Sequence, residues 1–156
     1  GIEVISVRST VGSQLQYAAD GTPHFVSDPD HCCNINKIQP LQPVLRSHDV
    51  WINGIRGDQS ETRRQLGRET RGPFNTLRYH PMLEWSSKEI FYYRKLYALP
   101  PHPLEEQGYP SIGCEPCTQP VLPNQHEREG RWWWETATDK ECGLHAGNVA
   151  AKAAAR

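Results

Sequence analysis

The sequence predicts an α/β fold, and three observations lead to this class. Residues 49–56 form a short, apolar run rich in β-favouring side chains, which is typical of a buried parallel strand. Residues 57–64 fit a helix start, because Asp58 is followed three positions later by Glu61, as in a capping box. Residues 84–99 carry apolar side chains at helical spacing. A strand that leads through a tight loop into a helix is a building unit of α/β folds.

Two further strands are expected. Residues 2–7 alternate and carry β-branched side chains, and residues 76–81 read as a short edge strand that ends at a proline. The helix at residues 84–99 has Ser86 or Ser87 as its cap. Its aromatic side chains share the apolar side of the helix, so we expect them in the core.

Helical turns and loops fill the rest of the chain. Residues 32–38 begin a helix whose apolar spacing continues beyond them, although Pro40 and Pro43 interrupt it. Residues 10–31 are polar and predict a loop with one short helical turn. Residues 67–73 predict another loop.

Composition limits the classes of function. The chain has 156 residues, 37% of them hydrophobic, and a net charge of -1, so we expect one domain or a large part of one, with neither nucleic acid nor membrane as partner. It has no apolar run long enough to span a membrane and no signal peptide, which predicts a cytoplasmic protein. In that reducing compartment, an odd set of 5 cysteines indicates metal binding or catalysis before disulfides. The chain starts without methionine, in a strand-like run, so we expect it to begin inside a longer protein.

The junction between the strand at 49–56 and the helix start is a candidate anion site. Backbone N–H groups at a helix N-terminus favour anions, and Arg56, Arg63 and Arg64 add positive charge. The alternative is an ordinary turn between strand and helix with solvated arginines, and the pattern alone leaves both open.

Four cysteines form two pairs. Cys32 and Cys33 are adjacent, and Cys114 and Cys117 form a CxxC, which brings two sulfurs to one metal centre through a tight turn. Adjacent cysteines diverge, so they suit the separate irons of an iron–sulfur cluster better than one zinc ion, although four thiolates suit either centre. A redox CxxC beside a merely buried pair is the other alternative, but Pro116 favours a turn over the helix that such a motif opens.

Cys142 stands apart from these pairs, beyond an extended arm marked by Pro120 and Pro123. Nearby cationic groups, including Lys140 and His145, lower the pKa of an exposed thiol and make it nucleophilic. An incidental surface cysteine is the alternative.

At these residues the chain resembles the C-terminal portion of bacterial assimilatory adenylylsulfate (APS) reductases, which are relatives of phosphoadenylylsulfate (PAPS) reductases. The resemblance covers nearly the whole chain up to His145. It rests on motifs in family order, namely Cys32-Cys33-Asn34-Ile35-Asn36-Lys37, Gly54-Ile55-Arg56 with Gln59-Ser60, Tyr79-His80-Pro81, Gly108-Tyr109-Pro110-Ser111-Ile112-Gly113-Cys114 with Pro116-Cys117-Thr118, Gly130-Arg131-Trp132-Trp133-Trp134-Glu135 and Lys140-Glu141-Cys142-Gly143-Leu144-His145.

The resemblance implies a reaction and assigns residues to it. Cys142 attacks the sulfur of APS and expels AMP, which leaves an enzyme S-sulfocysteine, and thioredoxin then releases sulfite for sulfate assimilation and cysteine biosynthesis. A [4Fe–4S] cluster without a redox role acts electrostatically, together with Lys37, close to the bound phosphosulfate. The cluster ligands are Cys32, Cys33, Cys114 and Cys117. Fixed cations aimed at the leaving phosphate stabilise the transition state most. The substrate-binding residues are Lys37, Arg56, Arg128, Arg131 and His145.

The resemblance also implies a parallel sheet of the adenine-nucleotide hydrolase-like type with a C-terminal arm. We expect residues 1–120 to form part of the reductase domain, residues 121–146 the arm that carries Cys142, and residues 147–156 a disordered tail. The Ser-Gly-Gly-x-Asp-Ser loop that binds the nucleotide in this family is absent, so we expect an N-terminally truncated portion that is inactive alone. PAPS reduction and a non-catalytic zinc-binding module are the rival functions, and a homo-oligomer is left open.

Overall fold

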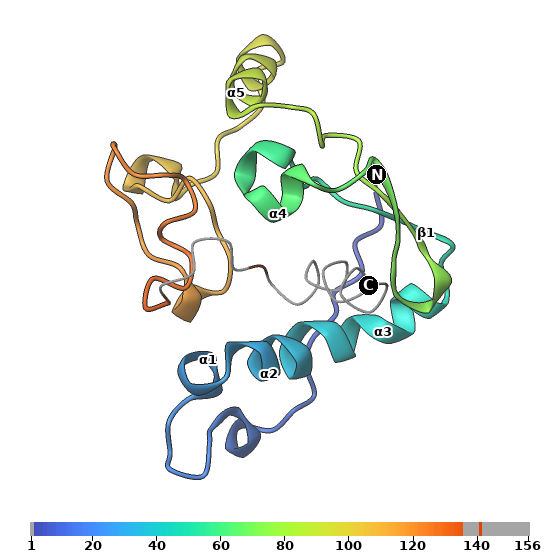
Figure 1. Ribbon diagram of the computed structural model, residues 1–156, viewed down its shortest axis with the longest axis vertical. Coiled ribbons are helices and arrows are strands. Elements are labelled where there is room, and N and C mark those ends of the chain that lie inside the picture. The colour runs from blue at the N-terminus through green and yellow to red at the C-terminus, as the bar shows by residue number, and fades with distance from the viewer. Residues whose placement is uncertain (1, 136–140, 142–156) are drawn as a thin grey trace. The chain divides into compact units, whose positions relative to one another are not determined.

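The structure is a computed structural model that describes residues 2–135 and 141 (Figure 1). These residues fall into two units. The first contains residues 2–51 and 71–77 with Glu141, and the second contains residues 52–70 and 78–135. Among the helices of the described residues, none combines the length and apolarity that a membrane crossing requires.

Helices dominate the first unit. They are α1 (His24–Ser27), α2 (Pro29–Cys33) and α3 (Gln39–Arg46), with a 3-10 turn at Ser13–Gln16 and a π-helix at Asn34–Ile38 between α2 and α3 (Figure 1). The turn at Ser13–Gln16 agrees with the single helical turn expected within residues 10–31, whereas α1 and the start of α2 replace part of the expected loop.

The helix after Cys33 continues through both prolines that were expected to interrupt it. Pro40 lies in the first turn of α3, and Pro43 lies inside that helix. At the end of the π-helix, the backbone N–H of Gln39 donates to the carbonyl of Asn34, five residues earlier. This wider turn directly precedes Pro40, which has no N–H to continue the usual ladder.

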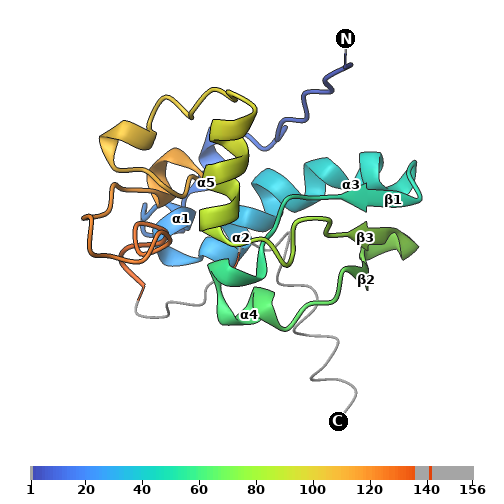
Figure 2. The same cartoon turned by 90° about the horizontal axis from the view of Figure 1, so that it is seen from above.

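Within residues 2–135, a sheet of three strands forms in the order β1-β3-β2, from β1 (Val50–Ile52), β2 (Glu69–Arg71) and β3 (Leu77–Tyr79) (Figure 2). The expected strand at 49–56 therefore forms only over residues 50–52. The expected edge strand at 76–81 is the central strand, and β2 lies in a segment expected to be a loop.

The sheet is mixed, which corrects the prediction of a parallel sheet. The Leu77 N–H donates to the Asp49 carbonyl (2.8 Å) and the Asn53 N–H to the Tyr79 carbonyl (3.1 Å), as parallel strands do. The Gly72 N–H donates to the Thr76 carbonyl (2.8 Å), which closes an antiparallel hairpin between β2 and β3. The α/β class is confirmed, with one parallel and one antiparallel pair.

The expected strand at residues 2–7 does not form. Ile2 is 94% exposed and Val4 is 83% exposed, and no strand of the described residues pairs with this segment. Alternation alone cannot hold a strand, because the ladder hydrogen bonds need a partner.

The second unit contains α4 (Glu61–Arg64) and α5 (Ser87–Leu96). The Ser86 side chain accepts from the Glu89 N–H, and the Glu89 carboxylate accepts from the Ser86 N–H (2.7 Å), which confirms the expected cap. The expectation that the aromatic residues of this helix lie in the core is wrong, because α5 contains no buried residue and Tyr92 is 58% exposed.

Candidate functional site

The first cysteine pair ends α2. The Asp28 side chain caps this helix by accepting from the His31 N–H (2.9 Å), and Pro29 occupies its first turn. Cys33 is buried and Cys32 is half-buried. The Cys32 sulfur lies 3.6 Å from the Asn36 side-chain nitrogen, a donor one turn further along.

The π-helix places the next residues of this motif. The Ser9 hydroxyl donates to the Ile35 carbonyl (2.9 Å), and the Asn36 side chain exchanges hydrogen bonds with Gln16 (2.8 and 3.0 Å). Lys37 lies in the last turn of the same π-helix and is half-buried. One-turn π-helices are frequent at functional sites, because they re-aim side chains within a helix.

The second cysteine pair lies on a 3-10 turn, as the CxxC spacing predicts. The Cys117 N–H donates to the Cys114 carbonyl (3.0 Å). The Thr118 hydroxyl donates to the same carbonyl (2.8 Å) and accepts from the Gly113 N–H (3.0 Å), so one side chain closes the loop. Cys117 is buried and Cys114 is half-buried.

Arg131 lies against the residue that precedes this turn. A Cβ added to Gly113 would collide with the Arg131 guanidinium, so only glycine allows the approach. The guanidinium donates to the Ile112 carbonyl (3.0 Å) and lies 4.8 Å from the centre of the Trp132 ring. A predicted substrate-binding residue and the CxxC turn are therefore neighbours.

Backbone pairing brings the arm back to the CxxC turn. The Gln119 N–H donates to the Gly130 carbonyl (2.9 Å), and the Trp132 N–H donates to the Cys117 carbonyl (3.0 Å). Trp132 is only 3% exposed, whereas Trp133 is 54% exposed. Two neighbouring tryptophans thus have different roles.

Arg128 and Arg56 are the other predicted substrate-binding residues that the structure describes in this unit. Arg128 is buried. The Arg56 side chain is 12% exposed and forms ion pairs with Asp58 (2.9 Å) and Glu127 (3.2 Å). Local patterns do not predict Glu127 as the partner of Arg56, because the two residues lie 71 positions apart.

At the candidate anion site at the start of α4, Arg63 and Arg64 are engaged by neighbouring residues. The helix cap is Ser60 rather than Asp58, and the Ser60 hydroxyl accepts from the Arg63 N–H (3.3 Å). The Arg63 side chain binds Gln59, and Arg64 pairs with Glu61 (2.6 Å). These contacts favour the alternative of an ordinary turn between strand and helix.

A buried polar cluster that sequence reasoning missed lies near β3. His80 is 1% exposed, with its Nδ1 atom 2.7 Å from the Asn53 side-chain oxygen and its Nε2 atom 3.1 Å from the Thr70 hydroxyl. Burial lowers the pKa of His80, and the positive charge of Arg78 lowers it further. Burial also lowers the pKa of Arg78. Sequence showed His80 within a motif but gave it no role.

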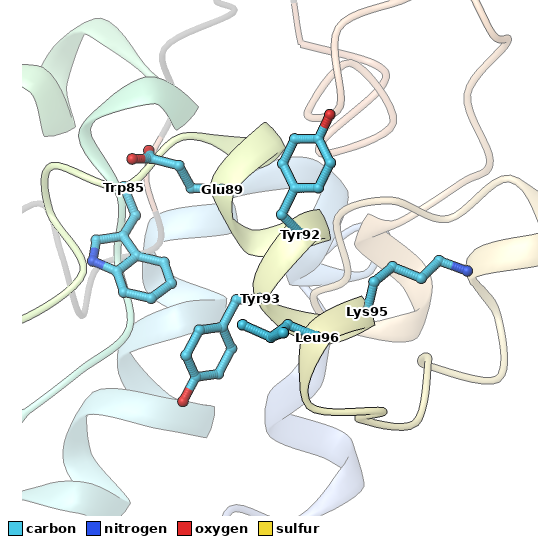
Figure 3. A pocket seen from close by; sticks show the side chains of 6 residues that line it. All are labelled: Trp85, Glu89, Tyr92, Tyr93, Lys95 and Leu96. Carbon is cyan, nitrogen blue, oxygen red and sulfur yellow. The ribbon is translucent and has the colours of Figure 1, made fainter.

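A pocket of about 690 Å³ lies along α5 (Figure 3). Its lining is mostly aromatic and aliphatic, and its two charges have opposite signs. The lining residues are Trp85, Glu89, Tyr92, Tyr93, Lys95 and Leu96. Because it holds no arginine and only one lysine, it lacks the convergent cations that a phosphosulfate requires.

The four predicted cluster ligands belong to different units, with Cys32 and Cys33 in the first and Cys114 and Cys117 in the second. Within residues 2–135 and 141, no three side chains of His, Cys, Asp or Glu gather in a group that would hold a metal ion. Each thiol pair lies on one short helical segment, and each could supply two ligands of a four-thiolate metal centre. The complete site stays a prediction. Cys142 and His145 lie outside the described residues.

Comparison with known proteins adds a family to this geometry. Residues 1–120 match the family model described as phosphoadenosine phosphosulfate reductase domain. Over 129 residues, the chain is 53% identical to adenosine 5'-phosphosulfate reductase of Pseudomonas aeruginosa (strain LESB58), covering 78% of this chain and 48% of that protein.

Two more distant relatives carry similar names. Adenosine 5'-phosphosulfate reductase of Lysinibacillus sphaericus (strain C3-41) is 39% identical over 147 residues, covering 92% of this chain and 61% of the relative. The chloroplastic 5'-adenylylsulfate reductase 3 of Arabidopsis thaliana is 41% identical over 128 residues, covering 76% of this chain and 28% of the relative. The chain spans about half the length of the first relative.

Proposed function

This chain belongs to the phosphoadenosine phosphosulfate reductase domain family, and we propose that it is the cysteine-bearing part of a thioredoxin-dependent APS reductase. The observation that carries the proposal is the 53% identity to a protein named adenosine 5'-phosphosulfate reductase. The reaction forms sulfite and AMP from APS, and it belongs to sulfate assimilation in the cytoplasm.

The proposed chemistry centres on Cys142. Its thiolate attacks the sulfur of APS, the S–O bond to the phosphate breaks, and AMP leaves with the electron pair. The enzyme then carries an S-sulfocysteine. The dithiol of thioredoxin supplies two electrons, which release sulfite, restore the Cys142 thiol and leave thioredoxin oxidised. The arm would carry Cys142 between these two partners.

The basic residues would stabilise the charge that develops on the leaving phosphate. We assign this role to Lys37, Arg128 and Arg131, with His145 near the nucleophile. The contact of Arg131 with Gly113 supports the assignment, because it puts a cation beside the CxxC turn. A guanidinium suits phosphate and sulfate because it donates two parallel bonds.

A [4Fe–4S] cluster is part of the proposal. Cys32, Cys33, Cys114 and Cys117 would hold it, and when bound it would act electrostatically, together with Lys37, rather than as an electron carrier. The half-buried and buried thiols of each pair support this ligand set. We also propose that the complete reductase domain has an adenine-nucleotide hydrolase-like sheet, of which this chain contributes one part.

Activity of the full-length protein tests the function. We expect sulfite release from APS with reduced thioredoxin, and we expect Cys142→Ser to abolish it while iron content stays unchanged. The family description also names the phosphoadenosine substrate, so PAPS is the second candidate. A competition assay with both nucleotides decides between them, and a preference for PAPS would overturn our choice.

Metal analysis tests the cluster independently of activity. Anaerobically purified full-length protein should contain roughly four irons and four sulfides per chain and absorb near ~400 nm. Serine in place of Cys114 should lower the iron content. One zinc and no iron, together with full retention of function in Cys142→Ser, would support the non-catalytic zinc-binding module instead.

A further inference from the structure

The Arg56 side chain joins three segments of the second unit. Its Nε donates to Asp58 (2.9 Å), and its Nη2 donates to the Ser87 hydroxyl (2.7 Å) and to both carboxylate oxygens of Glu127 (3.2 and 3.3 Å). Asp58 lies in the turn after Arg56, Ser87 begins α5, and Glu127 lies on the arm. One guanidinium therefore ties the arm to two elements that are distant in sequence.

The remaining contacts close this junction. The Asp58 carboxylate accepts from the Ser87 backbone N–H (2.7 Å), and the Ser87 hydroxyl lies within donating distance of Asp58 (3.1 Å) and Glu127 (3.2 Å). The Glu127 side chain is 22% exposed and that of Arg56 is 12% exposed. Because water screens this ion pair less than a pair on the surface, removing it should lower the stability of the protein more.

The position of Glu127 sets the turn that carries the basic residues. The Glu129 N–H donates to the His126 carbonyl (3.0 Å), and the Arg131 N–H donates to the Arg128 carbonyl (2.9 Å), so residues 126–131 form consecutive turns. Anchoring Glu127 within these turns fixes the starting points of the Arg128 and Arg131 side chains.

We propose that Arg56 and Glu127 form a clasp that holds the arm, with Glu127 as a positioning residue for the proposed reaction. Arg56 acts through Glu127 and does not touch the substrate. The inference rests on the proposed function for its effect on catalysis, although the clasp itself is a property of the fold. It gives Arg56 a role different from the substrate contact that the sequence predicted.

The charges around Arg56 favour this role. Asp58 and Glu127 place two carboxylates on one guanidinium, so the local sum of the three charges is negative. A phosphate or sulfate that approaches Arg56 meets like charge from both. Arg56 is therefore better placed to bind the Glu127 carboxylate of the arm than to bind an anionic substrate.

A double-mutant cycle on the full-length protein tests the clasp. The variants are Arg56→Gln, Glu127→Gln and the two combined, with Glu61→Gln as the matched control because Glu61 pairs with Arg64 on the surface (side chains 52% and 64% exposed). We expect each single clasp variant to lower kcat about tenfold, with KM for APS changed less than about twofold, and the combined variant to be no worse than either one. The control should match the wild type.

Denaturant unfolding of the same variants gives a readout that does not depend on APS. Non-additive loss of stability supports the clasp even if the wild type releases no sulfite from APS, a result that would refute the proposed function alone. Additive effects on stability overturn the clasp. So does a rise in KM confined to Arg56→Gln, because that result means Arg56 binds the substrate directly.

Discussion

Gly113→Ala tests the packing of Arg131 against the CxxC loop without changing what the backbone conformation allows. The backbone of Gly113 is not in the left-handed region, so alanine meets no conformational strain there. Its methyl group would instead displace the Arg131 guanidinium. That displacement removes the hydrogen bond to the Ile112 carbonyl and the cation–π contact with Trp132. A hydrogen bond to a charged group contributes about 1.5–3 kcal/mol, and an exposed cation–π contact contributes about 0.5–1 kcal/mol. Because both contacts of Arg131 are partly exposed, we take the lower end of their sum and expect the free energy of unfolding to fall by about 2 kcal/mol.

Equilibrium unfolding in denaturant measures this loss, and Gly12→Ala is the control. No atom lies within 4 Å of a Cβ at Gly12, so that variant should be neutral or stabilised by up to about 1 kcal/mol. Because Arg131 is assigned to the substrate, Gly113→Ala should also raise KM for APS. Equal unfolding free energies for Gly113→Ala and Gly12→Ala would show that the guanidinium does not depend on the missing Cβ.

Three further changes probe other parts of the second unit. Burial, and secondly the charge of Arg78, lower the pKa of His80, so the folded protein disfavours the protonated imidazole. The contribution of His80 to stability is therefore complete above about pH 6.5, the pKa of an unfolded histidine, and falls below that pH by up to about 1.4 kcal/mol per pH unit until the folded pKa is reached. Denaturant unfolding at several pH values should show this slope in the wild type and not in His80→Gln. Ser86→Ala removes the cap of α5 and should cost about 1 kcal/mol, with lower helicity by circular dichroism; an unchanged midpoint would contradict the capping role. Thr118→Val removes the hydroxyl that bridges the CxxC loop, and alkylation of Cys114 by iodoacetamide should accelerate; an unchanged rate would mean that the hydroxyl does not order the turn.

Local signals predicted α5 well, and non-local packing explains where the prediction failed. Ser86 and Glu89 are three residues apart, and their reciprocal hydrogen bonds depend only on that spacing. The cap at Ser86 was therefore predicted correctly, whereas the helix spans 87–96 rather than the expected 84–99. Its aromatic residues are exposed because periodicity defines an apolar side without specifying what covers it.

The strands were harder to predict because each has only three residues. Such a length contains too little alternation to separate a strand from a loop, as β2 shows. The place of β3 between β1 and β2 depends on hydrogen bonds to segments before it in sequence, including that from Leu77 to Asp49. No pattern within residues 76–81 contains that information.

The candidate site divides in the same way. The CxxC turn follows from local spacing and forms as predicted. The helix start expected at Cys32 was misplaced, because α2 begins at Pro29, within a segment expected to be a loop, and ends at Cys33. The union of the two pairs in one cluster is non-local, and so is the approach of Cys142 to the substrate. These remain proposals, supported by the resemblance and by the family match over residues 1–120.

Arg56 shows why residue type alone cannot assign a role to a cation. A unit charge at ~4 Å contributes about 4 kcal/mol at the effective dielectric constant of a protein surface, so one carboxylate offsets the attraction that a guanidinium offers an anion. Asp58, two positions away, is visible in the sequence, whereas Glu127 reaches Arg56 only through the return of the arm. With both carboxylates in place, a substrate anion is attracted by one positive charge and repelled by two negative charges. Arg56 would therefore bind substrate only after Glu127 leaves, and the kinetic cycle on these two residues measures whether it does.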